Sequence, residues 1–225
     1  MIHLHVRDEQ QKHSLAPEHY RAALKEVEAA VGKRMLIQVT SEAAGVYGAA
    51  EQMDAMLTLG PGCISAGLRE FVPDEAALQQ GADFFTRLHD LGTLVQYILY
   101  SPEDVRWYEQ LCSEGVIPKS PNLVLFVLGR YGAQTYGADL LPAYLAELQS
   151  QSPWMVCAFG EQEPVVMQQA IELGGHCRVG FENNLWLPDG SVAPSNSSLI
   201  KLVADMGRQQ RRAPANGQQA AALYG

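Results

Sequence analysis

The first residues of the chain place two histidines where they can act together. In Ile2-His3-Leu4-His5 the imidazoles stand at positions i and i+2. Side chains of a β-strand alternate between its two faces, so on a strand His3 and His5 point to one face while Ile2 and Leu4 point to the other. Two imidazoles on one face can bind a divalent metal, typically Zn²⁺, at about 2.0–2.1 Å. The alternative is a chance pair of surface histidines on an edge strand.

A second polar stretch lies near the C-terminal end of the chain. Residues 174–184 read GGHCRVGFENN and combine imidazole, guanidinium, carboxylate and amide groups. On a strand, Arg178 and Glu182 would project to the same side, because they are four residues apart and the side chains alternate. This stretch could supply a third ligand, which favours a metal site over a chance pair.

The composition of the chain bounds its class. The length of 225 residues is one that single α/β barrels routinely reach. A net charge of −9 argues against a nucleic-acid partner but leaves room for a small anionic substrate in a local basic pocket. The four cysteines form no Cys-x-x-Cys pair, which favours buried reduced thiols in a cytoplasmic protein over a disulfide framework. No apolar window is long enough to span a membrane, and no targeting segment is visible.

Expected strands and expected helices alternate along the chain. Nearly continuous aliphatic strands separated by amphipathic helices are typical of a parallel sheet covered by helices. The first helix shows the pattern well, because Pro17 suits its first turn and apolar residues follow at i, i+3 and i+4 spacing to Val31. We expect seven strands, over residues 1–6, 35–40, 63–67, 93–100, 122–128, 154–159 and 177–181, and polar loops that include residues 7–15.

Two ways of closing such a sheet are open, a doubly wound sheet and a (β/α)8 barrel. A Rossmann-type sheet predicts a Gly-x-Gly-x-x-Gly turn after an early strand, and none is present. Polar residues collect instead after the C-terminal ends of the strands, where barrel enzymes build their sites. The sequence therefore predicts one (β/α)8 TIM barrel domain over residues 1–225, although only seven of its eight strands are visible. The polar groups lie at residues 7–8, 40–42, 69–70, 161–163 and 182–184.

Two runs of residues resemble the signatures of a known enzyme family. Residues 1–8, MIHLHVRD, and residues 174–185, GGHCRVGFENNL, are similar to the two signatures of the β-keto acid cleavage enzymes, the 3-keto-5-aminohexanoate cleavage enzyme type. The resemblance extends over the whole chain. It implies a (β/α)8 barrel with a catalytic Zn²⁺ whose ligands, transferred by position, are His3, His5 and Glu182.

The resemblance also accounts for the missing strand. Members of the family carry a first βα unit, with a substrate-binding glutamate, before the His-x-His strand, and this chain starts on that strand. Either the start codon was assigned too late, or the chain is a shortened version whose barrel closes differently. A parallel barrel without one strand leaves two edges unpaired. We therefore expect this length of chain to be poorly soluble or to associate through the gap.

The reaction implied by the resemblance is a reversible Claisen-type exchange. A β-keto acid and the co-substrate acetyl-CoA give acetoacetate and a new acyl-CoA, while zinc polarises the keto oxygens of the substrate. Arg178 could bind the carboxylate or thioester oxygen, or take part in proton abstraction with an acidic partner. The residue at the partner's position is Asn183, whose amide lacks the charge that would orient or activate an arginine.

Three hydroxyl residues are candidates for substrate binding. The family has hydroxyls where Thr40 and Ser41 follow the second expected strand, and another where Ser65 lies on the third. The alternative for Thr40 and Ser41 is a role as strand-end caps of the next turn. On the fourth expected strand either Gln96 or Tyr97 must face the barrel interior, where the substrate class is selected.

Two other functions remain open from the sequence. A metal-dependent hydrolase of the amidohydrolase type also uses His-x-His on a barrel strand, but it expects further histidines on later strands, and residues 94–100 and 122–128 contain none. The other is a catalytically inactive barrel homologue that acts as a binding protein. We also expect the protein to form a homo-oligomer, a dimer or a tetramer.

Overall fold

The computed structural model describes residues 1–119, 122–129 and 140–224 of the chain. They form two compact units, and each is described by itself below. The first unit comprises Met1–Ile98, Trp107–Leu123 and Ala215–Gly225, and the second comprises Leu99–Arg106 and Val124–Pro214.

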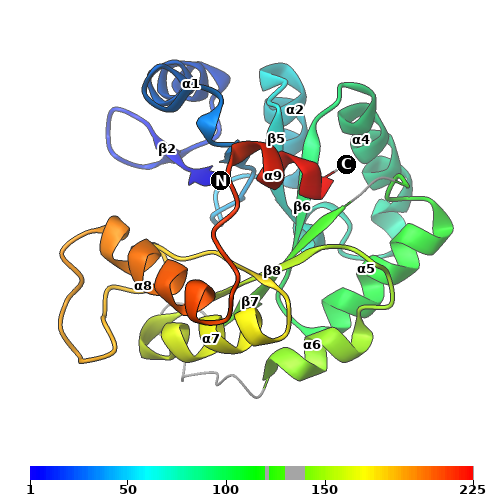
Figure 1. Cartoon of the computed structure of the whole chain (residues 1–225). Helices are drawn as coiled ribbons and strands as arrows, with labels where there is room; N and C mark the ends of the chain where they lie inside the picture. The colour runs from blue at the N-terminus through cyan, green and yellow to red at the C-terminus, as the bar shows by residue number, and fades with distance from the viewer. Residues whose placement is uncertain (120–121, 130–139, 225) are drawn as a thin grey trace. The chain divides into compact units, whose positions relative to one another are not determined.

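The first unit is a parallel sheet with helices between its strands (Figure 1). Its strands pair in the order β1-β4-β5-β6, which is also their order along the chain. A two-stranded antiparallel hairpin, β2 with β3, follows β1. The elements are β1 (Ile2–Leu4), β2 (Val6–Arg7), β3 (His13–Ser14), α1 (Pro17–Val31), β4 (Ile37–Thr40), α2 (Ala49–Leu59), β5 (Cys63–Gly67), α3 (Leu68–Phe71), α4 (Leu78–Asp90), β6 (Leu94–Leu99) and α9 (Gly217–Ala221), with short 3₁₀ turns at Gly32–Arg34, Glu75–Ala77 and Ala222–Tyr224.

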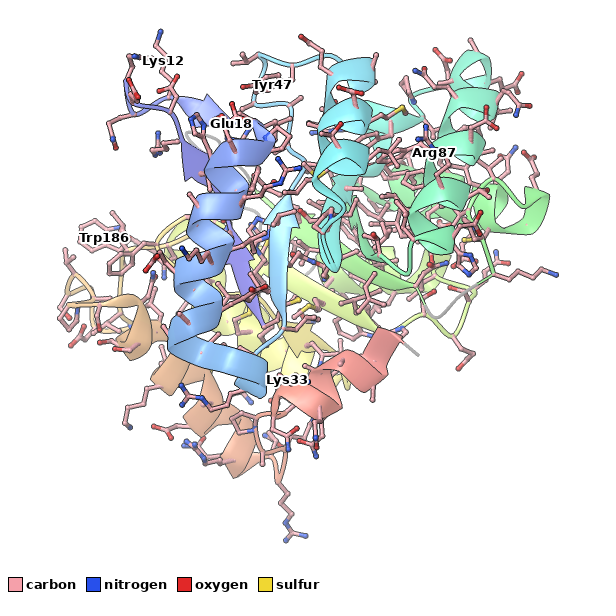
Figure 2. All side chains as sticks on the ribbon, turned by 90° about the horizontal axis from the view of Figure 1, so that it is seen from above. Lys12, Glu18, Lys33, Tyr47, Arg87 and Trp186 are labelled. Carbon is pink, nitrogen blue, oxygen red and sulfur yellow. The ribbon has the colours of Figure 1, made fainter. Side chains whose placement is uncertain are left out.

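Local sequence explains the boundaries of α1, which runs from near Glu18 to near Lys33 in Figure 2. Pro17 occupies its first position, where a missing N–H costs no hydrogen bond. Gly32 ends it with φ of 55°, a left-handed value that a residue with a Cβ adopts only under strain. The helix buries Tyr20, whose hydroxyl donates to the Thr40 carbonyl at 3.0 Å and so ties α1 to the end of β4.

The core of the first unit is aromatic on the helix side of the sheet. Tyr97 of β6 is buried, and its ring centroid lies 5.1 Å from that of Phe85 and 5.5 Å from that of Tyr108. Successive side chains of a strand point to opposite faces, so Gln96 lies on the other face of the sheet. The helix-side packing therefore decides which of the two residues can face a site.

The second unit contains the remaining parallel strands. β7 pairs with β8, and β8 pairs with β9. Gly175 precedes β9 at a close approach, because a Cβ there would collide with the ring of Trp154. The elements are β7 (Leu123–Leu128), α6 (Leu141–Glu147), β8 (Trp154–Ala158), a 3₁₀ turn (Gly160–Gln162), α7 (Glu163–Glu172), β9 (His176–Cys177) and α8 (Asn196–Gln209), while α5 (Pro102–Glu114) begins in this unit and ends in the first.

Two local predictions were wrong. The last strand is β9, which covers only His176–Cys177 rather than residues 177–181, because the chain turns at Gly180, whose carbonyl accepts from the Asn183 and Asn184 amides. The loop expected over residues 7–15 contains the β2–β3 hairpin, whose strands pair Arg7 with His13. In both places backbone hydrogen bonds, to the Gly180 carbonyl and between β2 and β3, decide the structure against the local residue pattern. The other expected strands are confirmed to within about two residues.

Seven parallel strands separated by helices place the described part of the chain in the α/β class. In that part, no helix combines the length and apolar character that crossing a membrane requires.

Candidate active site

His3 and His5 point toward one another as predicted, although β1 ends at Leu4 and His5 lies between β1 and β2 rather than on a shared strand. The two Nε2 atoms lie 2.9 Å apart, and the ring centroids are 4.8 Å apart in an edge-to-face arrangement. Two nitrogens bound to the same tetrahedral Zn²⁺ would be ~3.3 Å apart, given bonds of about 2.0–2.1 Å. The rings would have to separate by only a few tenths of an ångström to share one ion.

Both imidazoles have a partner for the nitrogen that faces away from this contact. His3 Nδ1 lies 2.8 Å from Oε1 of Gln38, its neighbour in the β1–β4 ladder. His5 Nδ1 lies 3.7 Å from a carboxylate oxygen of Glu42. Metal-binding histidines usually engage their second nitrogen in this way, which leaves the first for the metal. The donor set therefore fits a metal ion, and the Nε2 atoms would hold it.

The His5 side of this pair is further ordered by His13. The His13 ring centroid lies 5.9 Å from that of His5 and 5.9 Å from that of Tyr47, which is labelled in Figure 2. His13 Nε2 is 2.8 Å from the Glu42 carbonyl oxygen. The β2–β3 hairpin thus packs an aromatic cluster beside the histidines.

The face of the sheet that carries His3 continues as a row of polar side chains. Ladder pairing aligns Thr40 with Ser65 and Ser65 with Gln96, and Gln38 stands two residues before Thr40. Ser65 is 1% exposed, and its hydroxyl oxygen has no hydrogen-bond partner among the described residues. A buried hydroxyl without a partner is costly, so it suits a position that a polar ligand contacts.

Thr40 and Ser41 are both buried and both hydrogen-bonded to the main chain. Thr40 Oγ1 accepts from the Glu42 amide at 3.1 Å, and Ser41 Oγ donates to the Ser65 carbonyl at 2.7 Å. These bonds support the strand-end capping role for the two residues. Their contact with a substrate stays a prediction, and the same is true of Ser65.

Arg178 and Glu182 are joined by an ion pair, but not on a strand. Arg178 Nη2 donates to both Glu182 carboxylate oxygens, at 2.8 and 2.7 Å. Arg178 directly follows β9, its amide donating to the Val156 carbonyl at 2.9 Å, and Glu182 lies in the turn that begins at Gly180. The predicted shared strand face is therefore wrong, and the turn is what brings the two side chains together.

The turn that carries Glu182 is anchored by a buried carboxyl group that the sequence did not single out. Asn184 Nδ2 donates to Glu163 Oε2 at 3.0 Å, and the Asn184 amide side chain also pairs with the main chain of Trp186. Glu163 is 2% exposed, and burial raises its pKa to about 7. Asn183, 6% exposed, contributes its carbonyl to the Gly160 amide at 3.0 Å. The polar run at residues 161–163 was the only sequence signal for this anchor.

The cysteines do not supply a nucleophile to this chemistry. All four are free thiols. Burial raises the pKa of the Cys157 thiol to about 11 and that of the Cys177 thiol to about 12. A thiolate is the reactive form of cysteine, and it is scarce at neutral pH for such groups.

The fold is similar to that of barrel enzymes of known structure. A type I 3-dehydroquinate dehydratase from Clostridium difficile aligns with a TM-score of 0.57 over 86% of this chain and 76% of its own, at 8% identity. A phospho-2-dehydro-3-deoxyheptonate aldolase from Thermotoga maritima aligns with a TM-score of 0.56 over 92% of this chain and 59% of its own, at 13% identity. The described part of the chain is thus α/β with seven parallel strands, and its structural neighbours are TIM-barrel enzymes, which is consistent with an incomplete barrel of that fold.

The family follows from the sequence comparisons. The family model described as beta-keto acid cleavage enzyme matches residues 1–225, and the chain belongs to this enzyme family. A 3-oxoadipate:acetyl-CoA acetyltransferase from Cupriavidus necator is 27% identical over 100% of this chain and 80% of its own length. A 3-keto-5-aminohexanoate cleavage enzyme from Acetoanaerobium sticklandii is 23% identical over 100% of this chain and 83% of its own length.

Proposed function

We propose that this protein is a zinc-dependent enzyme that condenses a β-keto acid with acetyl-CoA to give acetoacetate and a new acyl-CoA. The family membership and the names of the two relatives support the reaction class. The observation that carries the zinc is the convergence of His3 Nε2 and His5 Nε2, with Gln38 hydrogen-bonded to the opposite nitrogen of His3.

The metal ligands in this proposal are His3, His5 and Glu182. Two imidazoles and one carboxylate form a donor set that catalytic zinc sites use, with one position left for water or substrate. When bound, the ion would act as a Lewis acid toward the keto oxygens of the substrate. The ladder pairing of β1 with β4 orients His3, and the turn at Gly180 presents Glu182.

Arg178 is the cationic residue of the proposed site. Its side chain is 13% exposed and ends in a planar, delocalised guanidinium cation. A guanidinium can pair with a substrate carboxylate or stabilise negative charge on a thioester oxygen. Asn183 cannot accept a proton as a carboxylate would, so we assign it no acid–base role. Ser65 is the hydroxyl best placed for a substrate oxygen, because its own oxygen lacks a partner among the described residues.

The assembly and compartment belong to the same proposal. The free thiols fit a reducing compartment, so we place the enzyme in the cytoplasm. We also propose one barrel domain over residues 1–225 that works as a homo-oligomer, a dimer or tetramer. Light scattering coupled to size-exclusion chromatography measures the oligomeric state directly.

The proposal is tested by turnover. The purified chain is incubated with a set of β-keto acids, with and without acetyl-CoA, and acetoacetate and the new acyl-CoA are measured. We expect both products only when acetyl-CoA is present, and none from the His3→Ala, His5→Ala double variant. His89→Ala, which changes a half-exposed histidine of α4 whose Nδ1 lies 3.5 Å from an Asp90 carboxylate oxygen, is the matched control.

Other outcomes separate the alternative functions. Acetoacetate released without acetyl-CoA contradicts the exchange reaction. Hydrolysis of amide or ester substrates instead indicates an amidohydrolase-type enzyme. Binding of β-keto acids without any turnover indicates a binding protein.

A further inference from the structure

We infer that Gln38 is a positioning residue of the proposed metal centre. Its side chain holds His3 in the tautomer that presents Nε2 to the metal. The expected effect on zinc binding rests on the proposed function. The hydrogen bonding between Gln38 and His3 does not, and it involves residues of the first unit alone. The sequence did not single out Gln38, which interrupts the aliphatic run of β4.

The hydrogen bonds of the Gln38 side chain determine the orientation of its amide. Gln38 is fully buried, and its Nε2 lies 3.4 Å from the Ile64 carbonyl oxygen and 3.2 Å from Gln96 Oε1. A main-chain carbonyl is only an acceptor, so the atom facing it must be the NH₂ group rather than the amide oxygen. The amide oxygen of Gln38 therefore faces His3.

The orientation of this amide determines which nitrogen of the His3 imidazole carries the proton. Gln38 Oε1 lies 2.8 Å from His3 Nδ1, and an amide oxygen only accepts. His3 Nδ1 must then carry the proton, which leaves a lone pair on Nε2 in the neutral ring. That lone pair points toward His5 Nε2, the direction in which the metal is proposed to bind.

His5 has a different kind of partner from His3. The partner of His5 Nδ1 is the Glu42 carboxylate, 3.7 Å away and too far for a direct hydrogen bond, and both side chains are substantially exposed. Gln38, by contrast, is bonded on both sides and has no room to rotate without losing the Ile64 contact. The fully buried Gln38 therefore sets the geometry of His3.

The tautomer can be read directly in the metal-free protein. In protein labelled with ¹⁵N-histidine, two-bond ¹H–¹⁵N correlation spectra distinguish Nδ1–H from Nε2–H rings, and the His3 signals are assigned by their loss in His3→Ala. We expect the Nδ1–H form for His3 in the natural protein and in Gln38→Glu, whose side chain keeps an acceptor. Gln38→Met removes the acceptor and should shift His3 toward the Nε2–H form.

The same variants report on the metal. In a chelator competition, Gln38→Met should weaken Zn²⁺ binding about 10–100-fold, as losses of such orienting partners do, while Gln38→Glu keeps or strengthens it. Gln52→Met is the matched control, since Gln52 is also a buried glutamine, and its Nε2 donates to Ser41 O and Glu70 Oε2. It should leave the His3 tautomer and the zinc affinity unchanged.

Each result bears on the inference separately from turnover. An Nε2–H ring for His3 in the metal-free natural protein would overturn it, even if Gln38→Met failed to fold. Equal zinc affinity in folded Gln38→Met and the natural protein would overturn it as well. If the tautomers behave as expected but the natural protein binds no zinc, the proposed function fails while the positioning by Gln38 stands.

Discussion

The two groups of proposed ligand residues are held in different ways. His3 lies within β1, its main chain paired with β4 and its ring hydrogen-bonded to the buried Gln38. Glu182 lies five residues beyond the two-residue strand β9, in a turn, with a side chain that is 40% exposed and paired with Arg178. A sheet ladder orders the imidazole without any metal, whereas the carboxylate is ordered by one turn and one ion pair.

This difference assigns separate tasks to the two regions. Side chains that are already held by buried hydrogen-bond partners lose little conformational entropy when they bind a ligand, which raises the affinity for that ligand. A carboxylate that already pairs with an arginine has to adjust that pairing when it binds a cation. We therefore expect the histidine region to determine metal affinity and the Glu182 turn to adjust reactivity, and the following experiments test this division.

The largest effect is expected for the histidines. The His3→Ala, His5→Ala double variant should fall from about one zinc per chain to almost none, because two of the three ligands are gone. Glu182→Gln should retain zinc more weakly, since the imidazoles stay in place. Elemental analysis of freshly purified protein measures both. Undiminished zinc in the double variant would refute the site, and equal losses in the two variants would refute the division of tasks.

The next effect is expected for Arg178. Arg178→Lys keeps the charge but loses the planar guanidinium, whose Nη2 donates to both Glu182 oxygens, and kcat should fall about 10²–10³-fold with zinc content unchanged. Steady-state kinetics with acetyl-CoA as co-substrate measures the change. Arg208→Lys is the control, because Arg208 makes a comparable ion pair with Asp205 on the exposed surface of α8. A loss of zinc together with activity would place Arg178 among the metal-site supports instead.

A smaller effect concerns the buried anchor of the turn. The pKa of Glu163 is about 7 in the folded protein, against about 4.5 for the unfolded chain. The folded protein therefore binds the proton of this carboxyl group more tightly. The resulting contribution to stability is complete below about pH 4.5 and is lost as pH rises through 7. At most about 3 kcal/mol is involved, from some 1.4 kcal/mol for each pKa unit. Glu163→Gln should remove this decline in the free energy of unfolding between pH 4.5 and 7.

Urea unfolding at a series of pH values measures this decline. Glu172→Gln, at the exposed end of α7, is the control and should retain the pH dependence of the natural protein. A Glu163→Gln curve parallel to that of the natural protein would show that this carboxyl group does not titrate in the window.

The smallest effect is expected for Asn183. Asn183→Asp restores a carboxylate beside the Arg178–Glu182 pair with almost no change of shape, and it should raise kcat by about tenfold or less or shift the pH profile of kcat. The pH dependence of kcat in the two proteins measures it. An unchanged profile would show that this position takes no part in proton transfer.

Much of the fold was predictable because it depends on local periodicity. The amphipathic spacing and Pro17 predicted α1 correctly, and the aliphatic runs predicted β4 to β8. The strand over residues 177–181 was not predictable, because its aliphatic and polar residues alternate as in a strand while the hydrogen bonds to the Gly180 carbonyl form a turn. Turn formation there depends on contacts with Glu163 and Gly160, which are distant in sequence.

The sequence by itself determined the alternation of strands and helices, the common face of His3 and His5, and the resemblance that led to the family. Those features follow from side-chain order along a single segment. The tertiary structure alone decided that Gln38 orients His3, that Gln96 rather than Tyr97 shares its sheet face, and that Arg178 reaches Glu182 across a turn. Partners of this kind come from ladder register and packing between distant segments, and no spacing within one segment encodes them.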